Sequence, residues 1–153
     1  MKSPASFVYG LYERRIAAGL NGSLPQHVGV MLDGNRRWAR AVGLATSDGH
    51  RAGADKIADL LTWCEEVGID HVTLWLLSTD NLKREAGQVS ELLEIIAGAI
   101  EALAEAGCWR LRIVGELDLL PPRIAERLRA AEVATADVDG VHVNCAVGYG
   151  GRN

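Results

Sequence analysis

From residue 27 onward, short apolar runs alternate with longer segments whose apolar residues recur at helical spacing. This alternation predicts an α/β fold, a parallel sheet covered by helices, because parallel neighbours are joined by crossover connections that are usually helices. The first run is apolar almost throughout, which is typical of a strand at the centre of such a sheet. The expected strands are residues 27–32, 71–77, 109–114 and 141–147.

The segments between the strands are predicted to be helices. The clearest is 50–67, where Ile57, Leu61 and Cys64 share one face and Gly68 supplies a natural stop. We expect residues 1–26 to form an N-terminal helix and a linker, and residues 27–153 to belong to one domain. The expected helices are 7–20, 36–42, 50–67, 88–106 and 121–134, with loops at 44–49 and 78–86.

Composition excludes several classes of protein. With a net charge of −4, the chain has no strongly basic field to attract nucleic acid. Its 3 cysteines are scattered and form neither a disulfide framework nor a CxxC metal pair. No apolar run reaches the roughly 18 residues that span a bilayer, and no signal peptide is evident. We therefore expect a cytoplasmic protein, and a peripheral contact with the plasma membrane stays open.

A charged cluster follows the first expected strand directly. Residues 33–40 contain one acid, Asp33, followed by Arg36, Arg37 and Arg40. Arginine side chains and the amides at the start of a helix both favour phosphate oxygens. Because a carboxylate repels a diphosphate, Asp33 is best suited to hold a Mg²⁺ ion that bridges to the phosphates.

A second polar cluster, residues 78–84, follows the second expected strand. Ligands of open α/β sheets bind beyond the carboxyl ends of the strands. A diphosphate held there would meet Asp33 and Arg37 on one side and Ser78 and Arg84 on the other.

Each of these features has a simpler explanation when taken alone. The Asp-Gly-Asn segment is usually a turn, an arginine pair is usually a solvated helix face, and His50 could simply begin a helix. Their combination at two strand ends favours a site for a phosphorylated ligand with Mg²⁺. The residues alone lead no further.

Five blocks in the same order resemble the undecaprenyl diphosphate synthase family, the cis-prenyltransferases. The likeness runs from about residue 27 to the end and points to the short-chain Z-isoprenyl (Z-farnesyl) diphosphate synthases of actinobacteria. The matching blocks are residues 27–39, 49–54, 77–84, 111–115 and 143–152.

The resemblance implies that an allylic diphosphate, geranyl or farnesyl diphosphate, condenses with isopentenyl diphosphate. It implies that Asp33 carries Mg²⁺ with the diphosphate, that Asn81 acts as proton relay, and that full-length members are homodimers. The substrate-binding positions it implies are Gly34, Asn35, Arg36, Arg37, Trp38, His50, Ser78, Thr79, Asp80, Leu82 and Arg84.

The chain departs from the family pattern at three positions. Thr46 replaces a phosphate-binding arginine, and Leu82 replaces an aromatic residue common in long-chain enzymes. Leu76 is bulkier than the small residue often found before the second cluster. Larger side chains near the mouth of a product tunnel should block elongation, so we expect a product of about farnesyl length.

Family members continue beyond the matched region and there supply an Arg and a Ser for isopentenyl diphosphate and a Glu for the metal. We therefore expect either a fragment of an ordinary enzyme or a chain completed by a second one. Three alternatives stay open. They are a branching, lavandulyl-type synthase, a non-catalytic subunit of a two-chain prenyltransferase, and a phosphate-binding module without turnover.

Overall fold

The computed structural model describes residues 24–150, so the helix expected at 7–20 lies outside the described residues. Helices and 3-10 turns (η) connect four strands. In chain order the elements are β1 (His27–Met31), α2 (Asn35–Ala41), α3 (Thr46–Glu66), β2 (His71–Ser78), η1 (Thr79–Lys83), α4 (Ala86–Ala106), β3 (Arg110–Val114), η2 (Leu117–Leu119), α5 (Pro122–Ala134) and β4 (His142–Tyr149).

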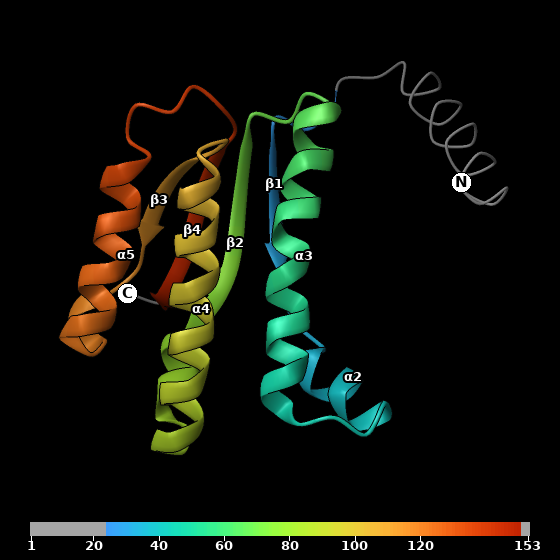
Figure 1. Cartoon of the computed structure of the whole chain (residues 1–153), viewed down its shortest axis with the longest axis vertical. Helices are drawn as coiled ribbons and strands as arrows, with labels where there is room; N and C mark the ends of the chain where they lie inside the picture. Colours follow the sequence, from blue (N-terminus) through green and yellow to red (C-terminus); the bar gives the residue numbers. More distant parts are fainter. Residues whose placement is uncertain (1–23, 151–153) are drawn as a thin grey trace, which may run out of the picture.

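The four strands form one sheet in the order β1-β2-β4-β3, and every neighbouring pair is parallel. The predicted α/β fold with a parallel sheet is confirmed. The long helices α3, α4 and α5 lie side by side over the same face of this sheet (Figure 1). Because the strands are parallel, their carboxyl ends all lie at the same end of the sheet, where α2 and η1 also lie.

The core lies between the sheet and these three helices. Val72, Leu74 and Leu77 of β2 are fully buried, as are Val143 and Val147 of β4. Side chains of a strand point alternately to its two faces, and a register shift after Trp75 pairs Leu77 with Val147, so all five residues join the same core. They lie on the two central strands of the sheet, β2 and β4. The polar residues that follow β2 are therefore attached to a well-packed strand.

The prediction that the first strand lies at the sheet centre is wrong for the described residues. β1 pairs with β2 alone and forms an edge of the sheet. Its alternating exposure shows that only every second side chain packs against the helices, and Met31 is 64% exposed. The apolar run predicted the strand itself, but neither its burial nor its place in the strand order.

Two other predicted boundaries need correction. The helix expected at 50–67 begins one turn earlier, at Thr46, because the Ala45 N–H donates to the carboxylate of Asp48 at 3.2 Å and caps the helix start. The segment expected as loop 78–86 contains the 3-10 turn η1 and the start of α4. Within residues 24–150, no helix has the length and apolar character needed to cross a membrane.

An ion-pair network joins α4 to α5. Arg127 donates two hydrogen bonds of 2.6 Å to the two carboxylate oxygens of Glu101 and a third of 2.6 Å to Glu94. Glu94 also accepts from Arg123 at 2.9 Å. The hydrogen bond from Arg127 lowers the pKa of Glu101, and the same contact raises the pKa of Arg127. This paired fork holds the two helices together.

We expect Arg127→Ala to lower the free energy of unfolding by about 1–2 kcal/mol, since the fork is bidentate but only partly shielded from solvent. Because the folded-state pKa of Glu101 is depressed, its contribution is present at neutral pH and lost as pH falls through that depressed value. Urea unfolding at several pH values measures this loss. Arg129→Ala is the control, since its 3.5 Å pair with Asp118 is solvent-exposed and should contribute little. Equal losses in both variants would contradict the network's role.

Candidate active site

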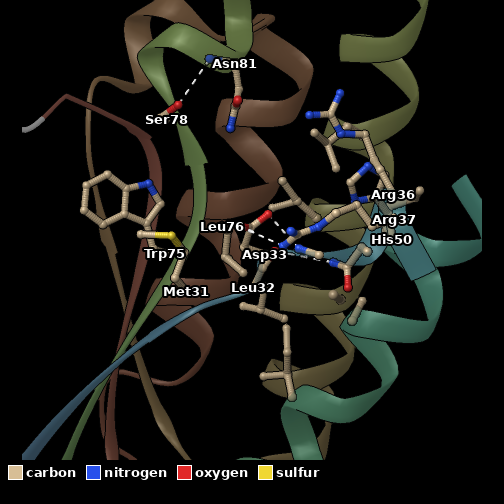
Figure 2. Close-up of a pocket in the computed structure, with 18 of the residues that line it drawn as sticks. Met31, Leu32, Asp33, Arg36, Arg37, His50, Trp75, Leu76, Ser78 and Asn81 are labelled. Carbon is tan, nitrogen blue, oxygen red and sulfur yellow. Dashed lines mark hydrogen bonds and ion pairs between the residues drawn. The ribbon is translucent and has the colours of Figure 1, made fainter. Parts of the chain in front are cut away.

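A cavity of about 440 Å³ opens beyond the carboxyl ends of β1 and β2. It receives polar residues from the β1–α2 loop, from α2, from α3 and from η1, and apolar residues from β2 and α4. Figure 2 shows Asp33, Arg36, Arg37 and His50 gathered on one side of β2, with Ser78 at the end of this strand and Asn81 beyond it. The structure thus brings the two sequence clusters to one cavity.

The loop after β1 presents Asp33 at the mouth of this cavity. Gly34 adopts a positive φ of 92°, which favours glycine, and its N–H donates to Asp33 Oδ1 at 2.6 Å. Asp33 Oδ2 lies 3.8 Å from Arg37 Nη2, and both side chains are largely exposed. The carboxylate is therefore oriented by its own backbone while one oxygen stays accessible.

Asp33 fits a particular kind of magnesium site. Among residues 24–150, no group of three or more His, Cys, Asp and Glu side chains could hold a metal ion by itself. Mg²⁺ is commonly held by one or two carboxylates and takes its other ligands from substrate phosphates and water. A single oriented carboxylate beside arginines matches that pattern and not a metal cage built from protein alone.

Guanidinium groups from α2 and from the end of η1 gather around His50 in the polar part of the cavity. Partial burial lowers the pKa of His50, and the nearby guanidinium groups of Arg36 and Arg84 lower it further against a smaller opposing effect of Glu91. Burial and Arg36 also lower the pKa of Arg84. The two positive guanidinium groups of Arg36 and Arg84 lie close together in a partly buried place, so an anion bound beside them would be favoured.

Ser78, Asn81 and Arg84 are organised by the turn η1. The Asn81 N–H donates to Ser78 Oγ at 3.2 Å, and Asn81 Oδ1 accepts a 2.5 Å hydrogen bond from Arg84 Nη2. This bond to Oδ1 orients the carboxamide of Asn81 and does not use its NH₂ group. The guanidinium group of Arg84 has further N–H donors for a ligand. This turn was not predicted, although the Ser at its start is a usual cap of a 3-10 or α turn.

Four predicted site residues do not line the cavity. Trp38 is 48% exposed on α2. Asp80 pairs with Lys83 at 2.8 Å on the surface, and Thr79 lies beside Gly150. Leu82 packs against the hydrophobic core instead. Thr46, where the family resemblance led us to expect an arginine, starts α3 and does not line the cavity either. The substrate-binding roles of these residues stay predictions.

Most of the apolar wall of the cavity was not predicted from the amino-acid sequence. Its residues come from the loop after β1 and from α3, β2 and α4, and the helical spacing of the α4 residues had indicated only a buried face. Since a buried face packs against either protein or ligand, spacing alone cannot distinguish core from cavity wall. Besides Leu76, the wall contains Leu32, Ile57, Leu92, Ile95, Ile96 and Ala99.

Comparisons with known proteins agree with this arrangement. The family model described as "Putative undecaprenyl diphosphate synthase" matches residues 31–153. The chain is 51% identical over 142 residues to isoprenyl transferase 1 of Streptomyces avermitilis, covering 92% of this chain and 55% of the relative. It is 52% identical over 147 residues to the (2Z,6E)-farnesyl diphosphate synthase of Thermobifida fusca, covering 95% of this chain and 58% of that protein.

A solved structure shows the same fold. Lavandulyl diphosphate synthase from Lavandula x intermedia, in complex with dimethylallyl diphosphate, has a TM-score of 0.80 and 27% identity, with 84% of this chain and 56% of that chain covered. The chain thus spans a little over half the length of the relatives it matches. Because the family model matches most of this chain, residues 31–153, the chain belongs to the undecaprenyl diphosphate synthase family of cis-prenyltransferases.

Proposed function

We propose that this chain forms the allylic-diphosphate half-site of a short-chain Z-prenyltransferase, meaning the part of the active site that binds the allylic substrate. One observation carries the proposal. The cavity joins a cationic head, built by Arg36, Arg37 and Arg84 with the imidazole of His50 beside them, to an apolar wall that includes Leu76. A ligand with a diphosphate head and a prenyl tail matches both parts at once.

In the proposed reaction the C–O bond of the allylic diphosphate breaks and its electron pair leaves with the diphosphate. The allylic carbon bonds to the double bond of isopentenyl diphosphate, and loss of a proton forms the new Z double bond. Separation of charge makes the first step difficult, so fixed cations that receive the departing diphosphate lower its barrier most. We assign this role to Arg36, Arg37 and Arg84, because all three line the cavity.

Asp33, which lines the cavity, would hold Mg²⁺ at the diphosphate. When bound there, the ion would neutralise charge that develops on the leaving diphosphate. Asn81, fixed by Ser78 and Arg84, would lie near the reacting carbons and is the proposed proton relay.

Product length is proposed to be about that of farnesyl diphosphate. Leu76 lines the apolar part of the cavity together with Ile96 and Ala99, and its bulk should limit the length of a prenyl chain there. The Thermobifida fusca relative, named (2Z,6E)-farnesyl diphosphate synthase, is 52% identical. A long polyprenyl product from the active protein would overturn this part of the proposal.

A branching synthase is the second candidate, because the lavandulyl enzyme shares the fold at a TM-score of 0.80. Its 27% identity is well below the 52% of the linear Z-farnesyl synthase, which favours linear elongation. Analysis of the product formed from dimethylallyl diphosphate alone distinguishes the two candidates, since only a branching enzyme would form a lavandulyl skeleton.

The proposed function is tested by incubating the purified chain with geranyl diphosphate and labelled isopentenyl diphosphate, with and without Mg²⁺. A Mg²⁺-dependent product of one defined length would support it, either from the chain alone or from a homodimer detected by sedimentation. A folded chain that binds the allylic diphosphate but incorporates no label would overturn the transferase activity for this chain and leave only the half-site.

Binding of a diphosphate should change the pKa of His50. Because burial and Arg36 depress the folded-state pKa of His50, its protonation costs stability, and folding weakens as pH falls through the unfolded-state value. A bound diphosphate favours the protonated form, so inorganic diphosphate should raise the pKa of His50 in an NMR titration. Affinity should accordingly be greater near about pH 6 than about pH 8, and His50→Asn should reduce this difference. An unchanged His50 titration in the presence of bound diphosphate would contradict its placement in the site.

A further inference from the structure

Two glycines of α3 form a notch for the start of α2. A Cβ atom built on Gly49 would lie 2.3 Å from the backbone oxygen of Asn35, and one on Gly53 would lie 2.7 Å from Asn35 Nδ2 and 2.8 Å from Asn35 Oδ1. Real Cβ atoms do not approach so closely, so no side chain fits at either position while Asn35 keeps its place. The two glycines lie one turn apart on the same helix face.

The notch faces the residue that begins the diphosphate-binding turn. Asn35 is the first residue of α2 and is followed directly by Arg36 and Arg37. Its amide Nδ2 reaches back toward the carbonyl of Leu32 at 3.5 Å, at the end of the first strand. Asn35 is thus wedged between the β1 end and α3, and its position sets where the following arginines stand.

The same turn of α3 also contributes to the cavity. His50 follows Gly49 and Ala54 follows Gly53, and both line the cavity together with Arg36 and Arg37. Close seating of Asn35 on the glycines therefore decides how far these arginines lie from His50. A displacement of about 1 Å at such a point can change binding or catalysis by up to about 10²-fold.

We propose that Gly53 is a positioning residue of the diphosphate site and acts through the side chain of Asn35. The proposal rests on the half-site function above. Gly53 has no side chain to touch a ligand, and helix formation alone would favour alanine at its place. Its role is to leave room for the Asn35 carboxamide, so that α2 approaches α3 and its arginines converge with His50.

The test compares Gly53→Ala with Gly98→Ala. Gly98 lies inside α4, and a Cβ there meets no atom within 4 Å, so both variants gain helix propensity but only one fills the notch. Binding of inorganic diphosphate with Mg²⁺ is measured by calorimetry. We expect Gly53→Ala to weaken binding on the order of tenfold and Gly98→Ala to leave it unchanged. Gly53 is preferred to Gly49 because its added methyl meets a side chain and not backbone.

A double-mutant cycle identifies the contact itself. Asn35→Ala removes the atoms that the new methyl would strike, so Gly53→Ala should have little further effect in that background. An equal loss in both backgrounds, or normal binding by the Gly53→Ala single variant, would overturn the proposal. If Gly53→Ala prevents folding, recovery of the fold by adding Asn35→Ala would support it, and continued misfolding would contradict it.

A readout without ligand separates this inference from the proposed function. The side-chain amide resonance of Asn35 should shift in Gly53→Ala and stay in place in Gly98→Ala. Absence of diphosphate binding by the natural chain would overturn the half-site, while this shift would still report the notch. An unshifted Asn35 resonance with intact binding by the natural chain would overturn the notch alone.

Discussion

Replacement of Asp33 by asparagine should lower Mg²⁺-dependent turnover by about 10³-fold, because the variant keeps the shape of the site but loses the charge that holds the ion. Asp33 is the acid presented by the loop after β1, and the Gly34 N–H already orients one of its oxygens. Asparagine can still accept this bond, so the fold should persist. The measurement is steady-state incorporation of isopentenyl diphosphate over a range of Mg²⁺ concentrations.

The control for this variant is Asp59→Asn. Asp59 is an exposed acid on α3 that pairs with Lys56 at 2.9 Å, away from the cavity. Its loss changes the net charge equally and should leave turnover unaltered. Should Asp33→Asn change only the metal dependence of binding in a chain without turnover, the phosphate-binding module would be the better description.

The second large effect is expected at Arg84. Its guanidinium both faces the cavity and donates to Asn81 Oδ1 at 2.5 Å, so its removal takes away a cation and releases the proposed proton relay. We expect Arg84→Met to lower kcat/KM on the order of 10²-fold. Pre-steady-state and steady-state kinetics with geranyl diphosphate measure the loss.

Arg84→Lys separates the two roles of this side chain. Lysine keeps the charge but has no planar fork to hold Asn81 while it binds phosphate. Affinity for the allylic diphosphate should therefore be partly retained, whereas kcat should fall nearly as far as in Arg84→Met. Full activity of Arg84→Lys would show that charge alone matters and that Asn81 needs no support from this residue.

Much of the fold could be predicted from the sequence because each strand and helix has its own apolar period. The alternation of the two periods from residue 27 onward was enough for a parallel α/β sheet. The place of β1 at the edge could not be predicted, since strand order depends on contacts between distant segments. The early start of α3 depended on one cap, the bond from Ala45 to Asp48.

The site was predictable where chemistry is local in the sequence. Asp33 and the arginines after it follow a strand directly, and the topology of parallel sheets brings them beside Ser78 and Arg84. Contacts between different elements were beyond such reasoning. The packing of Leu82 into the core and the seating of Asn35 on Gly53 both depend on the three-dimensional approach of two helices or turns.

The most direct test of the half-site is calorimetric binding of geranyl diphosphate to the whole chain, with and without Mg²⁺, repeated with Asp33→Asn. The structure predicts binding that requires Mg²⁺ in the natural chain and that is strongly weakened in the variant. A folded natural chain that does not bind geranyl diphosphate, or binds it equally well without Mg²⁺ and without Asp33, would contradict the half-site.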